Sequence, residues 1–232
     1  GRGGMFTGLA LFQDAFVYVH SYHLSETTQR CDVYLCDISS GCSGTILEIE
    51  LPREGYWCPG VGSPLDMDEN YVVYESNRQG ITAGQQIYLL DVTTGEERQI
   101  SVSTGGVLEP RIWGKNVVYF GWYQGNPEVY LYDIETGSTE NLTNSFDSII
   151  SEDFPALWGN VIAFRRAPSE ADANFLGDIY MMDITEREFI PVCTNAATVN
   201  GPIDIFNGLV SWTDYRNDPC PNMECRPTNT DI

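Results

Sequence analysis

Short apolar segments alternate with polar turns along the whole chain, and this alternation recurs about every 46 residues. The second apolar segment of each repeat carries an aromatic residue: Tyr18, Tyr74, Tyr119, Phe164 and Trp212. The steps between these residues are 56, 45, 45 and 48 residues. Sequence periods in this range are typical of solenoids, propellers and arrays.

Within each repeat, the pattern predicts four short antiparallel strands. A first apolar strand, such as 111–113, is followed by a turn rich in Gly, Asn and Asp, which indicates a hairpin. The third strand is the most regular, as in 128–133, and ends in an aspartate before the next turn. We expect these aspartates to bond the backbone amides of that turn: Asp37, Asp91, Asp133 and Asp183. Four strands without a helical period indicate an all-β propeller blade, and neighbouring blades must stack to bury their faces.

Two segments carry a family resemblance. Residues 212–217 read W-T-D-Y-R-N, and residues 128–137 read E-V-Y-L-Y-D-I-E-T-G, followed by N-L-T at 141–143. This pattern resembles the TolB-like propeller repeats of secreted and cell-surface proteins, and the resemblance covers nearly the whole chain. It implies a propeller fold, but such blades serve binding proteins, enzymes and surface arrays alike. The chain departs from the pattern at Trp122-Tyr123, where the second repeat has Asn77-Arg78.

The repeats predict one domain over residues 1–232, with blades at about 9–52, 53–103, 104–146, 147–195 and an incomplete fifth at 196–232. The fifth repeat reaches only Asp231-Ile232, which match the start of a third strand. Three explanations are open. The chain is a fragment, or it is an excerpt of a larger propeller with more blades, or a neighbouring subunit completes the fifth blade.

Charge narrows the choice of partners. The chain carries 33 acidic against 12 basic residues, a formal net charge of −21. This balance argues against nucleic acid and anionic membranes as partners. No run of 18 apolar residues occurs, so we expect no membrane insertion.

Seven cysteines predict an oxidising compartment, which would be extracellular, at the cell surface or periplasmic. Two short spacings give candidate disulfides: Cys36 with Cys42 across a hairpin turn, and Cys220 with Cys225 around a short loop. The partners of Cys31, Cys58 and Cys193 stay open, and the odd count leaves at least one thiol unpaired within the chain.

A ring of variable residues follows the aromatic position of the repeats, at the end of the second strand. We expect a ligand or peptide site here, with a solvated loop rim as the competing interpretation. The candidate residues are Tyr22, Arg78, Tyr123, Arg166 and Arg216.

One acidic cluster is a candidate for calcium, the only cofactor that the sequence suggests. Asp66, Asp68 and Glu69 lie beside a turn and could supply the oxygen ligands that calcium prefers. Their spacing lacks the glycine and the terminal glutamate of a calcium loop, which favours a solvated hairpin turn.

Catalysis has little support in the sequence. There is no Gly-x-Ser-x-Gly motif and no nucleophile with an evident histidine partner. The leading hypothesis is therefore a non-catalytic secreted or cell-surface propeller that mediates protein or glycan binding or assembly. Two alternatives stay open: a polysaccharide-active lyase or glycosidase, and a structural subunit of an extracellular filament or layer that self-assembles through its incomplete fifth blade.

Overall fold

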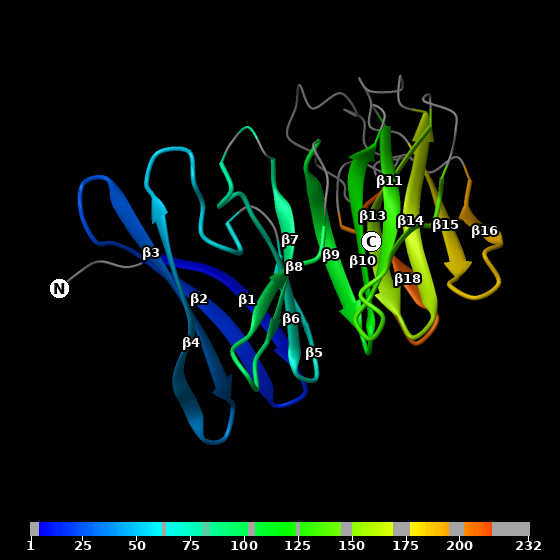
Figure 1. Cartoon of the computed structure of the whole chain (residues 1–232). Coiled ribbons are helices and arrows are strands. Elements are labelled where there is room, and N and C mark those ends of the chain that lie inside the picture. The colour runs from blue at the N-terminus through cyan, green and yellow to red at the C-terminus, as the bar shows by residue number, and fades with distance from the viewer. Residues whose placement is uncertain are drawn as a thin grey trace. The chain divides into compact units, whose positions relative to one another are not determined.

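A computed structural model describes residues 5–61, 64–80, 82, 84–101, 105–123, 126–144, 150–168, 177–194 and 202–214. In these ranges the protein is all-β, with four four-stranded antiparallel sheets and one two-stranded sheet (Figure 1). We call the sheets blades 1 to 5 in chain order. The same ranges hold no helix with the length and apolar character that a bilayer crossing requires. The predicted propeller-type blades are thus confirmed.

The strands of each sheet pair in the order of the sequence. Blade 1 holds β1 (Met5–Phe12), β2 (Ala15–His23), β3 (Thr28–Asp37) and β4 (Gly41–Pro52). Blade 2 holds β5 (Asp66–Asp68), β6 (Tyr71–Ser76), β7 (Gln86–Asp91) and β8 (Glu97–Gln99). Blade 3 holds β9 (Val107–Trp113), β10 (Asn116–Tyr123), β11 (Asn126–Asp133) and β12 (Thr139–Asn141). Blade 4 holds β13 (Ile150–Trp158), β14 (Val161–Pro168), β15 (Asp178–Asp183) and β16 (Phe189–Cys193). Blade 5 holds β17 (Asp204–Phe206) and β18 (Leu209–Ser211).

The chain divides into two compact units. The first comprises residues 1–117 and 132–139, and the second comprises residues 118–131 and 140–232. Strand β9 therefore belongs to the first unit, whereas most of β10 and β11 belongs to the second.

In the first unit, the core lies between blades 1 and 2. Side chains alternate across a strand, so Val17 and Val19 of β2 point to one face and are fully buried. They belong to one apolar cluster with Met67 of β5 and with Val72 and Tyr74 of β6. Blade 2 thus turns the aromatic side of its second strand toward the valine side of blade 1.

In the second unit, blade 4 repeats this arrangement. Phe164 of β14 and Leu157 of β13 cluster with Val118 and Val129, which lie on β10 and β11 of blade 3. A further cluster joins the opposite face of blade 4 to Ile203 and Ile205 of blade 5, and it includes Ala163 and Ile179. The inner strands of blade 4 are therefore buried by neighbours on both faces.

Two-residue turns join the first two strands of every blade. Their first residues all adopt positive φ, a backbone conformation that hairpin turns of this length require. These residues are Gln13 (53°), Glu69 (49°), Gly114 (57°), Gly159 (61°) and Asn207 (49°). The predicted hairpins are confirmed, and non-glycine residues accept the left-handed conformation at three of them.

The aspartates that end the third strands cap the turns that follow. Asp37 Oδ1 accepts hydrogen bonds from the backbone N–H groups of Ser39 and Ser40, at 2.9 and 2.8 Å. Equivalent bonds form at the other three blades, which confirms the predicted role: Asp91 with Thr93, Asp133 with Thr136, and Asp183 with Thr185. Hydroxyl bonds from Ser39 and Thr93 are the largest influence on Asp37 and Asp91, and the backbone bonds are the largest on Asp133 and Asp183. All of them favour the ionised carboxylate and lower the pKa of the four aspartates.

Two disulfides involve cysteines of blade 1. Cys36 is joined to Cys42 across the β3–β4 turn. Cys31 of β3 is joined to Cys58, a pairing that the sequence left open, and this bond ties the connection between blades 1 and 2 to the sheet. Cys220 and Cys225 lie outside the described residues.

The hydrogen bonds of Asp37 predict how the stability of the protein depends on acidic pH. Hydrogen bonds from Ser39 and Ser40 lower the pKa of Asp37 to about 2. A carboxyl group with a depressed folded-state pKa contributes stability above its unfolded value of ~3.9, and loses it as pH falls through the folded value. We expect the stability difference between wild type and Asp37→Ala to shrink as pH falls from about 4 to about 2. Urea unfolding over this range measures it. A difference that stays constant with pH contradicts the assignment.

Candidate functional site

One face of blade 1 gathers apolar and aromatic side chains from its first three strands. We call it the first-blade face, and its members are Phe6, Leu9, Leu11, Phe16, Tyr18 and Tyr34. Tyr18 lies at its centre, paired across the sheet with Leu9 on one side and Tyr34 on the other. The Tyr18 ring stacks on Phe6 at 5.0 Å and on Tyr34 at 4.8 Å between centroids. Burial in this stack, and then the neighbouring Tyr34, raise the pKa of Tyr18.

Comparison between repeats shows what normally covers this face. Leu11, Met67 and Leu157 all lie two residues before the first turn of their blades. Met67 and Leu157 are 4% and 8% exposed, because each packs against the preceding blade. Leu11 is 60% exposed and Leu9 is 57% exposed. The first-blade face thus has the surface of a blade-to-blade contact, but it is open to solvent.

A polar network borders the first-blade face. Tyr22, one of the predicted site residues, donates from its hydroxyl to Asp32 Oδ2 at 3.0 Å. Arg30 Nε donates to Asp32 Oδ1 at 2.6 Å, and Arg30 also pairs with Glu48. Burial, followed by the bond to Asp32, raises the pKa of Tyr22. Tyr22 therefore supports the edge of this face through the buried Asp32.

The two described arginines of the predicted ring are each held by a carboxylate of their own blade. Arg78 forms two bonds to Glu97, at 2.6 and 2.8 Å, and lies 3.8 Å from the centre of the Tyr88 ring. Arg166 Nε lies 3.2 Å from Oε1 of the buried Glu152. Both guanidinium groups are therefore paired with a carboxylate of the same blade.

Tyr123 and Arg216 complete the predicted ring. Tyr123 is the last residue of β10. Arg216 lies outside the described residues.

The candidate calcium ligands act as backbone acceptors. Asp66 Oδ1 accepts from the N–H of Met67 and Oδ2 from that of Ile112, both at 2.9 Å. Asp68 Oδ2 accepts from the N–H of Gly114. Burial is the largest influence on both carboxyl groups and raises their pKa. Across the ranges that the structure describes, no three or more His, Cys, Asp or Glu side chains are grouped to hold a metal ion. Glu69 instead occupies the first turn position.

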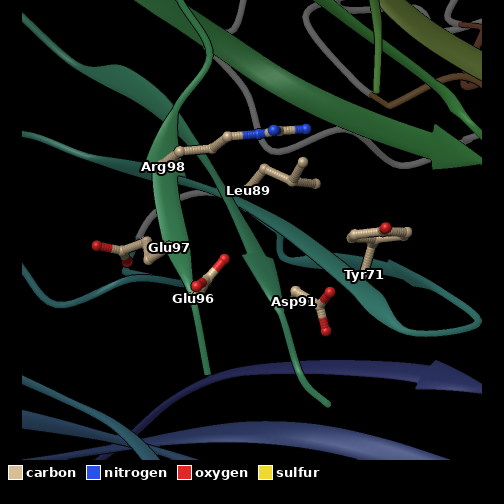
Figure 2. A pocket seen from close by; sticks show the side chains of 6 residues that line it. All are labelled: Tyr71, Leu89, Asp91, Glu96, Glu97 and Arg98. Atoms are coloured by element: carbon tan, nitrogen blue, oxygen red, sulfur yellow. The ribbon is translucent and has the colours of Figure 1, made fainter. Parts of the chain in front are cut away.

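A small acidic pocket lies on the face of blade 2 that points away from blade 1 (Figure 2). Its volume is about 140 Å³, and its lining comprises Tyr71, Leu89, Asp91, Glu96, Glu97 and Arg98. The carboxylate of Glu97 points away from that of Asp91 (Figure 2). Arg98 donates to the carbonyl oxygen of Ile134 at 3.1 Å. Because Glu97 is engaged by Arg78 and Arg98 by the backbone, this pocket is weaker than the first-blade face as a binding site.

Comparisons with known proteins agree with the fold. No protein-family model matches the chain, and no curated protein matches it. TolB from Acinetobacter baumannii is similar over 94% of this chain, with a TM-score of 0.60 and 19% sequence identity. The chain spans 50% of the length of that TolB chain.

Other solved structures give similar values. The nidogen/laminin complex matches 97% of this chain and 79% of its own, with a TM-score of 0.56 and 8% identity. An oligogalacturonate lyase in complex with manganese matches 93% of this chain and 62% of its own, with a TM-score of 0.53 and 14% identity. At such low identities the likeness shows the fold alone, which binding proteins and enzymes share.

Because Met67 is covered and Leu11 is open, we expect truncating the two side chains to destabilise the protein by different amounts. Met67→Ala removes a buried side chain from the core and should lower the free energy of unfolding by ~2–5 kcal/mol. Leu11→Ala, at the corresponding exposed position, should cost less than ~1 kcal/mol. Chemical denaturation of both variants measures this. Equal costs would show that the first-blade face is already covered in solution.

The bond from Ile112 to Asp66 predicts a graded effect. Asp66→Ala leaves the Ile112 N–H without its acceptor and should destabilise the protein by ~1–3 kcal/mol. Asp66→Asn keeps an acceptor oxygen and should cost less. Thermal or urea unfolding of the two variants separates them, and an equal loss in both would rule out the role of this bond.

Proposed function

We propose that this protein is a non-catalytic propeller of the cell surface, the periplasm or the extracellular space, which binds a protein or glycan partner, or assembles, through its first-blade face. The two disulfides indicate an oxidising compartment outside the cytoplasm, where such bonds persist. The single observation that carries the proposal is the exposure of Leu9 and Leu11 beside the stacked aromatic rings.

The composition of the face supports binding. Soluble proteins seldom expose contiguous apolar surface without a partner for it. Tyrosine, phenylalanine and arginine are enriched at protein interfaces, and tyrosine and arginine contribute strongly to binding energy. The first-blade face combines Tyr18 and Tyr34 with the neighbouring Arg30. Its centre is therefore apolar and its border is polar, as at protein interfaces.

Rigidity supports the same function. Tyr18 is stacked on both sides, and the border is tied together by the bonds of Asp32. The Cys31–Cys58 bond fixes β3 to the following connection. Binding to such a surface requires little ordering of side chains, which lowers the entropic cost of association.

Matched substitutions test the proposal. Leu9→Ser combined with Leu11→Ser removes apolar surface from the first-blade face, whereas Ile38→Ser removes an equally exposed apolar side chain from the β3–β4 turn. Binding would be measured by fluorescence anisotropy with oligogalacturonate, cello-oligosaccharide and peptidoglycan fragments, and self-association by sedimentation velocity.

We expect at least one of these interactions to weaken about tenfold or more in the double variant, a loss of ~1.4 kcal/mol, and to be unchanged in Ile38→Ser. If the wild type and the double variant behave alike in every assay, the first-blade face is not the binding surface.

A further inference from the structure

A second open face lies at the other end of the described repeats, on β17 and β18. Asp204 pairs with Ser211 and Phe206 with Leu209, so these four side chains share one face of the hairpin. Phe206 is 69% exposed and Leu209 is 76% exposed. The opposite face of the hairpin is buried through Ile205 in the cluster with blade 4. We call the exposed side the β17–β18 face.

Asp204 occupies the same position in its blade as Asp66 and forms one of the two hydrogen bonds that Asp66 forms. Both lie three residues before the first turn of their blade. In both, Oδ1 accepts a hydrogen bond at 2.9 Å from the backbone N–H of the next residue. Oδ2 of Asp66 bonds the N–H of Ile112, on the first strand of the next blade. Oδ2 of Asp204 has no hydrogen bond within the described part of the chain, and its residue is exposed.

Strand β1 offers the complementary donor. It is an edge strand, so the backbone N–H groups of alternate residues point away from β2. Leu11 precedes its turn by the same two residues as Ile112, whose N–H binds Asp66. By this correspondence, the N–H of Leu11 points out of the open edge of blade 1. The N–H of Ile112 points in the same way out of blade 3, toward blade 2. The first-blade face and the β17–β18 face thus carry the two halves of a blade-to-blade contact.

We propose that the partner of the first-blade face is a second copy of this chain, seated head to tail through its β17–β18 face. Phe206 and Leu209 of one copy cover Leu9 and Leu11 of the next, and Asp204 accepts the N–H of Leu11. This proposal rests on the proposed function and names its partner. Because the two faces differ, the contact is heterologous and repeats into open chains or closed rings.

The charge of the protein sets a condition for this assembly. At a net charge of −21, two copies repel one another at low ionic strength. Salt screens this repulsion, so association should strengthen as ionic strength rises toward ~0.15 M. An interface that depended on ion pairs would instead weaken.

Two variants, each blocked at one face, give the decisive experiment. Leu9→Lys with Leu11→Lys blocks the first-blade face, and Leu209→Lys blocks the β17–β18 face. The full chain would be examined by sedimentation velocity over a range of protein concentrations, with circular dichroism to verify folding and Ile38→Lys as the matched control.

The wild type and the control should exceed the monomer mass of 25.9 kDa increasingly as concentration rises. Each blocked variant should remain monomeric alone. An equimolar mixture of the two should form a species of two chains that grows no further, because each variant keeps one intact face. Asp204→Ala should weaken wild-type association about tenfold, since a charge-assisted hydrogen bond is lost.

Three results would overturn the proposal: a wild type that stays monomeric at every concentration, blocked variants that still associate alone, or a mixture that forms no pair. If the wild type stays monomeric but a glycan probe binds and is lost with Leu9→Ser and Leu11→Ser, only the head-to-tail partner is excluded. If neither self-association nor any probe depends on this face, the proposed function fails as well.

Discussion

The fold depends on the burial of each blade's inner strands by the blades beside it. The second and third strands carry apolar side chains on both faces, so a single four-stranded sheet would leave both faces in water. In the first unit, the valine side of blade 1 meets Met67 and Tyr74 of blade 2. In the second, blade 4 is covered on both faces. The same requirement explains why the uncovered face of blade 1 is apolar.

Hydrogen bonds from carboxylates to backbone groups fix how blades 2 and 3 align. Asp66, Asp68 and Glu75 of blade 2 each accept an N–H from β9 or the turn that follows it. Apolar packing is non-directional, whereas these bonds specify which residue of β9 lies opposite which residue of blade 2. Burial raises the pKa of Asp66 and Asp68, while the backbone bonds act in the opposite direction. These carboxylates therefore contribute specificity to a contact whose main stabilisation is apolar.

Local features could be predicted from the sequence, and features that depend on distant partners could not. The alternation of apolar residues, the hairpin turns and the caps at Asp37 and its equivalents follow from residues within one repeat. The bond from Asp66 to Ile112 spans 46 residues, and the pair of Arg78 with Glu97 spans 19. No motif near Asp66 or Arg78 in the sequence indicates these partners. The open first-blade face was also missed, because Leu9 and Leu11 are as apolar as their buried equivalents; their exposure comes from the lack of a covering sheet in the described structure.

In the proposed assembly, the edge of β1 is the unsatisfied half of a blade-to-blade contact. Amide hydrogen exchange resolved by NMR tests it at the backbone of Leu11, with Ile112 as the internal reference that is already bonded. We expect fast exchange at Leu11 in dilute protein and increasing protection as concentration rises, with Ile112 protected throughout. Protection of Leu11 that is already complete in dilute protein and independent of concentration would contradict it.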